Sequence, residues 1–271
     1  MKKPIRILAA VLAAMTLCLL FAACEEKPEA IEVISEQCVP LFNEALEQYK
    51  TADCRSSARA TATAAEGDVK ASYIQSFESL LHNKAGEKKI TSKYFVTDGD
   101  PLKVEASAFE PFYDCYIKDG ICYFDFGDES VNYKAPFVGD YLSKIGLYAF
   151  SDRMPRSVYA VKDRDVIRLD MSFAPEDCAE MEEMFVATMN TVLFQSAPKT
   201  EVDRLSLLAY LDAETHRLMN YTVVFGATVP EQPDVALTFT YSEEFSDYGT
   251  KEEIVFPDLT AFPEQDLSQV E

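Results

Sequence analysis

LMNYTVVFGATV, residues 218–229, and VALTFTYSEEF, residues 235–245, are long runs in which apolar and polar side chains alternate. The apolar side chains at every second position are expected to share one face of each strand: Met219, Tyr221, Val223 and Phe225 in the first run, and Val235, Leu237, Phe239 and Tyr241 in the second. Strands of ten or more residues exceed the usual five or six. The two runs therefore predict a broad, curved antiparallel sheet and argue against a compact sandwich.

The same alternation recurs through most of the chain outside these two runs. Further strands are predicted over 55–64, 71–81, 90–97, 103–109, 157–161, 166–173, 202–211 and 252–256. A hairpin is predicted over Tyr113–Phe126, because Asp119-Gly120 suits a two-residue turn. That turn would pair Ile117 with Cys122 and Cys115 with Phe124.

Two of these predicted strands carry unusually small side chains on one face. They are Ala58, Ala60, Ala62 and Ala64 on the first, and Val104, Ala106 and Ala108 on the other. Alanine is a poor strand former, so a run at alternate positions needs a reason on the side that the methyl groups face. One reason is close approach of a packed helix. The other is room for an acyl chain, and on that hypothesis these seven residues line a ligand cavity.

Helical periods appear in three places. Apolar residues recur every three or four positions over Glu32–Lys50, where Pro40 predicts either a kink near Gln37 or a separate first turn before a helix that begins at Val39. A second long helix is predicted over Pro175–Phe194, since acidic residues in its first turns suit the helix dipole. Asp140 can cap a short helix between them.

The N-terminus has the three-part pattern of an export signal. Met1–Arg6 is basic, Ile7–Phe21 is almost wholly apolar, and the small residues Ala22-Ala23 precede Cys24. The segment resembles a bacterial lipoprotein signal, although Phe21 stands where that family usually has leucine. The resemblance implies cleavage before Cys24 and attachment of diacylglycerol to its sulfur. Two alternatives remain, an uncleaved membrane helix over residues 7–23 and ordinary secretion, which the bulky Phe21 disfavours.

The domain organisation follows from that signal. We expect a signal peptide over 1–23, an acidic tether over 24–32, one domain over 33–263 and a flexible tail over 264–271. No linker of proline, glycine and serine interrupts the chain from Val33 to Pro257. The protein should be held by a lipidated Cys24 on the extracytoplasmic face of the bacterial cell membrane.

The negative net charge of the chain argues against anionic binding partners. Three of the 25 basic residues lie in the signal, which leaves 22 against 46 acidic residues and a formal net charge of −24. Nucleic acids and anionic lipid headgroups are bound by lysine and arginine, and so neither is an expected partner. Membrane attachment would have to come from covalent lipid, for which more than one acyl chain is needed.

Five cysteines follow Cys24, and an odd number cannot all form disulfides. Cys38 is about three helical turns from the end of its helix, too far from Cys54 for a disulfide. Cys115 and Cys122 would share a face of their hairpin only diagonally. We expect most of these thiols, with Cys178, to be reduced and buried.

The last third of the chain carries a second resemblance. Residues 211–218, the strands at 221–225 and 238–241, Tyr248-Gly249 and Val255–Pro257 look like the closing strands of the LolA/LolB/LppX-like lipoprotein-carrier superfamily. The resemblance implies an α+β fold in which a long curved antiparallel sheet forms an open half-barrel, with two long helices and one short helix packed in the concave face. It also implies carriage of a lipid or another hydrophobic molecule.

The sequence lacks the residue patterns that are typical of enzyme active sites. His82 and His216 lack a partner at metal or catalytic-triad spacing, and no nucleophile elbow or glycine-rich phosphate loop occurs. Acidic pairs such as Glu243-Glu244 are expected by chance among 46 carboxylates, and we interpret them as solvated faces. We therefore expect no catalytic residue, no cofactor and no metal site. The leading hypothesis is a non-enzymatic lipoprotein with a hydrophobic ligand cavity, and the alternative is an envelope protein-interaction scaffold without a cavity.

Overall fold

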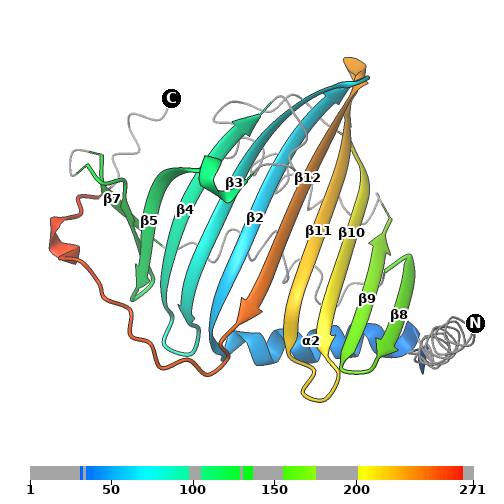
Figure 1. Cartoon of the computed structure of the whole chain (residues 1–271), viewed down its shortest axis with the longest axis horizontal. Coiled ribbons are helices and arrows are strands. Elements are labelled where there is room, and N and C mark those ends of the chain that lie inside the picture. The colour runs from blue at the N-terminus through cyan, green and yellow to red at the C-terminus, as the bar shows by residue number, and fades with distance from the viewer. Residues whose placement is uncertain are drawn as a thin grey trace, which may run out of the picture.

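A computed structural model describes residues 31–32, 35–97, 105–128, 131–136, 155–174 and 201–264. These residues form one large antiparallel sheet and one long helix (Figure 1). The strands are β1 (Ile31–Glu32), β2 (Asp53–Glu66), β3 (Val69–His82), β4 (Glu87–Thr97), β5 (Glu110–Lys118), β6 (Ile121–Asp125), β7 (Tyr133–Pro136), β8 (Ser157–Asp163), β9 (Val166–Phe173), β10 (Glu201–Asp212), β11 (Leu218–Val229) and β12 (Gln232–Ser246). The helix is α2 (Ser35–Lys50), and two short 3-10 helices cover Ala106–Ala108 and Leu259–Ala261.

The sheet is open and curved, and its strand order is β1-β8-β9-β10-β11-β12-β2-β3-β4-β5-β6-β7. Strand β1 lies at one edge beside β8, whereas β2 lies near the middle beside β12. Strands β2 to β7 build one half of the sheet outward to the other edge, and β8 to β12 complete the half between β1 and β2. The predicted curved antiparallel sheet is confirmed. Of the predicted helices, only the first falls in the described part of the chain, and those over 175–194 and from Asp140 lie outside it.

The first helix begins three residues later than predicted. Ile31 and Glu32 pair with Lys162 and Val161 of β8, so the helix starts only at Ser35. Pro40 lies inside α2, and no separate helix begins at Val39. At the sixth position of the helix, Pro40 removes the backbone hydrogen bond to the carbonyl of residue 36 and crowds the preceding turn.

Helix α2 packs against one face of the sheet, which we call the helix face. Its buried residues are Cys38, Phe42, Ala45, Leu46 and Tyr49. The ring of Tyr49 meets that of Phe245 on β12 at 5.0 Å between centroids. In Figure 1 the helix crosses the strands near one end of the sheet. No helix in the described ranges is apolar over a length that would cross a membrane.

The helix face carries the main core. It combines the predicted apolar faces of β11 and β12 with buried residues of β8, β9, β10, β2 and β3. Met219 is the exception, being 38% exposed where Tyr221 is 1% exposed. The register explains it, because Leu211 pairs with Leu218 and Tyr210 with Asn220, which leaves Met219 as the extra residue of a β-bulge.

The other face, which we call the outer face, is covered in part by the end of the chain. Phe262 is buried against Tyr116 and Tyr123 of β5 and β6, together with Ile254, Phe256 and Leu259. The predicted strand over 252–256 is therefore wrong. This segment does not pair with a neighbouring strand. The carbonyl oxygen of Glu252 lies 2.8 Å from His82 Nε2, and the apolar side chains that follow pack on the outer face of the sheet.

Candidate functional site

The alanines of β2 form a strip along the middle of the helix face. Ala58, Ala60 and Ala62 are 6%, 0% and 1% exposed, and Ala64 is partly buried beside them. Six residues of strand separate the ends of the strip, which makes it about 20 Å long. We call Ala58, Ala60, Ala62 and Ala64 the alanine strip.

Larger side chains flank the alanine strip on both sides. On β12, Leu237, Phe239 and Tyr241 lie opposite Ala64, Ala62 and Ala60. On β3, Tyr73 and Phe77 lie opposite Ala62 and Ala58. Paired residues of neighbouring strands have Cβ atoms about 5 Å apart, so the methyl groups form a row of small side chains between two rows of larger, mainly aromatic ones.

The second predicted set of cavity residues is not a strand face. Ala106 and Ala108 lie in a 3-10 helix, and Val104 lies outside the described residues. The prediction of a strand over 103–109 failed at 106–108 because the sequence Ala-Ser-Ala alternates small residues without any bulky side chain to fix a sheet register. The alanine strip is thus the part of the predicted cavity lining that the structure places together.

A polar cluster lies at one end of the alanine strip. Glu243, which pairs with Ala58 on one side and Tyr221 on the other, faces the same side as the strip. Its Oε2 accepts hydrogen bonds from the hydroxyls of Tyr221 at 2.9 Å and Tyr241 at 3.2 Å. Burial, followed by the charge of Glu243, raises the pKa of Tyr221 well above its ordinary value.

The sequence interpretation of Glu243 as part of a solvated acidic pair is wrong. Glu244 is exposed, but Glu243 is half-buried. The signal that could have separated them is the period of two, since Glu243 follows Leu237, Phe239 and Tyr241 in the apolar register of its strand. A carboxylate in that register needs hydrogen-bond donors, and the tyrosines supply them.

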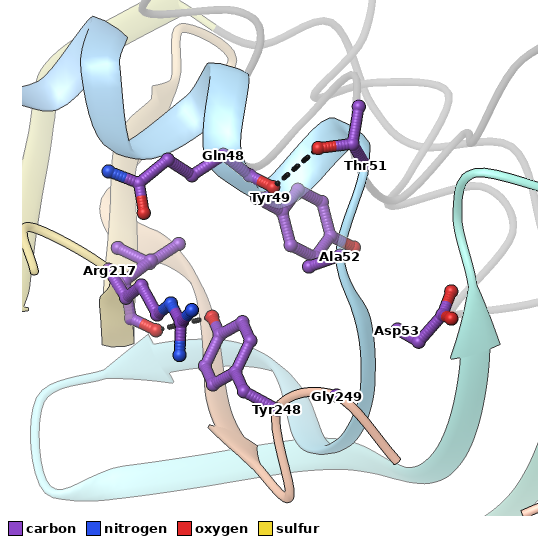
Figure 2. Close-up of a pocket in the computed structure, with 9 residues that line it drawn as sticks. Gln48, Tyr49, Thr51, Ala52, Asp53, Arg217, Tyr248 and Gly249 are labelled. Carbon is purple, nitrogen blue, oxygen red and sulfur yellow. Dashed lines mark hydrogen bonds between the residues drawn. The ribbon is translucent and has the colours of Figure 1, made fainter. Parts of the chain in front are cut away.

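Beyond the polar cluster, a pocket of about 370 Å³ opens between the end of α2 and the loop after β12 (Figure 2). Its lining includes Tyr49, Asp53, Arg217 and Tyr248. The Arg217 guanidinium carbon lies 5.6 Å from the centre of the Tyr248 ring, and the Tyr248 hydroxyl donates to the carbonyl oxygen of Leu218. This contact fixes the loop after β12 to the start of β11.

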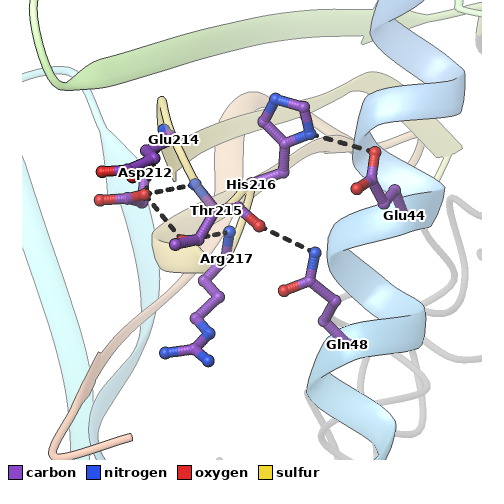
Figure 3. Close-up of polar contacts among 7 residues, drawn as sticks. All are labelled: Glu44, Gln48, Asp212, Glu214, Thr215, His216 and Arg217. Carbon is purple, nitrogen blue, oxygen red and sulfur yellow. Dashed lines mark hydrogen bonds and ion pairs between the residues drawn. The ribbon is translucent and has the colours of Figure 1, made fainter.

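The turn between β10 and β11 holds α2 in place (Figure 3). Gln48 Nε2 donates to the Thr215 carbonyl oxygen at 2.9 Å, and His216 Nδ1 lies 3.1 Å from Glu44 Oε2. Asp212 stabilises the turn by accepting hydrogen bonds from the backbone and hydroxyl of Thr215, both at 2.7 Å. These bonds from Thr215 lower the pKa of the Asp212 carboxyl.

Both histidines therefore take part in structural contacts. His82 contacts Glu252 and lies 3.5 Å from Asp53 through Nδ1. Within the described ranges, no group of three or more His, Cys, Asp or Glu residues could hold a metal ion.

The cysteines in the described ranges after Cys24 are buried and unbridged: Cys38, Cys54, Cys115 and Cys122. The hairpin register pairs Ile117 with Cys122 and Cys115 with Phe124, which confirms the predicted pairing. Cys178 and the predicted lipidation site Cys24 lie outside the described residues.

Comparison with known proteins assigns the chain to no family. No family model matches the sequence, and no curated protein matches it significantly. Among solved structures, lipovitellin superposes on 76% of this chain with a TM-score of 0.40 and 10% identity, and the chain spans 26% of the lipovitellin chain's length. An outer membrane lipoprotein-sorting protein domain from Vibrio parahaemolyticus gives a TM-score of 0.25 at 8% identity over 83% of this chain and 97% of that one.

A DUF1329 family protein from Desulfovibrio piger gives a TM-score of 0.23 at 9% identity, covering 80% of this chain and 95% of its own. These TM-scores are too low to indicate a function, so the functional proposal rests on the geometry of the site.

Proposed function

We propose that this chain is a non-enzymatic lipoprotein, anchored by lipid on Cys24 to the extracytoplasmic face of the bacterial membrane, and that it binds the acyl chain of an amphiphile along the alanine strip. The single observation that carries the ligand-binding part is the buried row of methyl groups between larger, mainly aromatic side chains in the middle of the helix face.

The shape of the alanine strip supports an extended hydrocarbon ligand. The strip follows one strand for about 20 Å, and alanine leaves more room above the sheet than any larger side chain would. The flanking side chains, which include Phe239 and Tyr73, are mainly apolar or aromatic, and Gln75 of β3, opposite Ala60, is a polar residue among them. An apolar chain placed there would exchange water for contact with these rings, which is favourable.

The polar cluster supports an amphiphile and not a plain hydrocarbon. Glu243 and the hydroxyls of Tyr221 and Tyr241 lie at the Ala58 end of the strip, so an acyl chain on the strip would place its polar end beside hydrogen-bonding groups. Sites for small molecules commonly combine an apolar lining with a few polar groups that fix orientation.

The strip is covered in the structure described here, since Ala60 and Ala62 are 0% and 1% exposed. Binding therefore requires the groups that cover it to move aside. A ligand can drive such a change only through the difference in its affinity for the open and covered states. The ligand must then gain enough from contact with the alanine strip and its flanking rings to offset the loss of the existing contacts.

The test is native mass spectrometry of the protein purified from its own cells. The proposal expects added mass from a noncovalent amphiphile, released by organic extraction, in addition to any lipid on Cys24. Protein that carries no noncovalent lipid, even after incubation with lipids extracted from the same cells, would favour a scaffold without a ligand cavity.

A further inference from the structure

A second cavity, of about 580 Å³, lies on the outer face of the sheet, away from the alanine strip. Its side chains come from five neighbouring strands, β11, β12, β2, β3 and β4, together with Phe109 from the segment before β5. Across four strand spacings this groove extends for about 19 Å. We call it the outer-face groove.

The strand register arranges the lining in two rows. One row contains hydroxyls and cations: Thr222, Ser242, Arg59, Ser76 and Lys93. The other contains an amide, carboxylates and a hydroxyl: Asn220, Glu244, Ser57 and Glu78. Ala58, Tyr221 and Glu243, which alternate with these residues, direct their side chains to the helix face and can close the groove only with their main chain.

Small hydroxyl side chains line much of the outer-face groove, and they leave space because they are short. Ser57 donates to Glu78 Oε1 at 3.0 Å, and the hydroxyls of Thr222 and Ser242 lie 3.0 Å apart, so these groups are held in fixed positions. Phe109 stands over the Arg59 side chain, with the guanidinium carbon 5.6 Å from the ring centre. This contact places an aromatic wall beside a polar floor.

The chemistry of the groove selects among ligand classes. Two cations, Arg59 and Lys93, balance two carboxylates, Glu78 and Glu244, so the lining gives no net attraction for a phosphate or another strongly charged group. An extended peptide would need a free strand edge, and all five strands are paired on both sides. A floor of hydroxyl, amide and carboxylate groups beside one aromatic ring suits a neutral molecule that has many hydroxyl groups.

We infer that the outer-face groove is a binding site for an uncharged oligosaccharide. Sugar hydroxyls donate to Glu78 and Glu244 and accept from Arg59 and Asn220, because both kinds of hydrogen bond are available to a hydroxyl. The Phe109 ring covers an apolar face of one sugar ring. The site is independent of the alanine strip, since it lies on the opposite face of the sheet.

The test is isothermal titration of the purified full chain with three probes, chitotriose, maltotriose and cellotriose, in a detergent without a sugar headgroup. Saturable binding of at least one probe with a Kd of about 1 mM or tighter is expected. Phe109→Ala and Glu244→Gln should each weaken that binding by about tenfold or more. Tyr159→Ala, which removes an aromatic side chain that is 57% exposed on β8, is the control and should leave it unchanged.

Two results would overturn the inference. One is the absence of saturable binding for all three trisaccharides. The other is binding that neither Phe109→Ala nor Glu244→Gln weakens, which would place the sugar elsewhere. Glu244 is exposed, so its substitution should not disturb folding even if loss of the Phe109 ring does.

Discussion

Ala60 on β2 lies directly opposite Tyr241 on β12, so a methyl group and a buried phenol ring are neighbours on the helix face. The Tyr241 hydroxyl reaches Glu243, two residues along the same strand, at 3.2 Å. The Tyr241 side chain therefore contacts both the alanine strip and the polar cluster. The relation between alanine strip and polar cluster is thus fixed by strand register and is independent of loop conformation.

The docking of α2 can be tested at Leu46, which is 2% exposed in the main core. Leu46→Ala should lower the free energy of unfolding by about 2–5 kcal/mol, because it removes buried methyl groups and leaves a cavity. Gln37→Ala, at an exposed position of the same helix, is the control and should change it by less than about 0.5 kcal/mol. Urea unfolding followed by circular dichroism measures both, and equal effects would mean that α2 is not docked as described.

Membrane attachment should depend on Cys24. Cys24→Ser removes the sulfur that the lipoprotein signal would modify, and the strongly negative net charge of the remaining chain opposes binding to anionic lipid. The protein should move from washed membranes to the soluble extracytoplasmic fraction. Retention of the variant in those membranes after signal cleavage would refute the lipid anchor.

The five cysteines after Cys24 should all be reduced. Labelling of the unfolded, unreduced protein with a thiol reagent is expected to find five thiols, whereas three or fewer would reveal a disulfide. In the folded protein Cys54 should resist labelling at pH 8, because burial, and to a lesser degree the charge of Glu243, raises the pKa of its thiol to about 12. Mass spectrometry of labelled peptides separates the sites.

Stability should fall at alkaline pH. Burial, with a smaller contribution from Tyr94, raises the pKa of Tyr73 to about 12, and Tyr221 is shifted in the same direction. Between pH 10 and about 12, the unfolded tyrosines lose their protons while the folded ones keep them, so rising pH favours the unfolded state. Urea unfolding at pH 8 and pH 11 should show this loss, and the double substitution Tyr73→Phe and Tyr221→Phe should reduce it. An unchanged pH dependence in that variant would contradict the assignment.

The long strands could be predicted from sequence because their alternation of apolar and polar residues extends over many positions. β11 has the predicted bounds, Leu218–Val229, and the Asp119-Gly120 turn has the positive φ angles, 53° and 74°, that such a hairpin requires. Prediction from the local alternation pattern failed where contacts between residues far apart in the sequence determine the structure. Residues 252–256 have a strand-like pattern, but the apolar surface of Tyr116 and Tyr123 draws this segment across the outer face.

The candidate site was only partly predictable for the same reason. The alanine strip follows from one strand's sequence, since alternate residues of a strand share a face. The role of Glu243 depends on pairing between β11 and β12, which places Tyr221 within hydrogen-bond distance. The outer-face groove needs the register of five strands at once, and no single segment contains that information.

The most direct test of the central proposal is the amount of noncovalently bound lipid in Ala60→Leu and Ala62→Leu, measured by native mass spectrometry beside the free energy of unfolding. Ala236→Leu is the control, since Ala236 is exposed on the outer face opposite Ala65. If the alanine strip holds an acyl chain, the first two variants should lose bound lipid with little loss of stability, and the control should keep it. If both variants instead lose about 1–3 kcal/mol of stability, as overpacking predicts, and keep their bound lipid, the strip is plain core and the proposal is wrong.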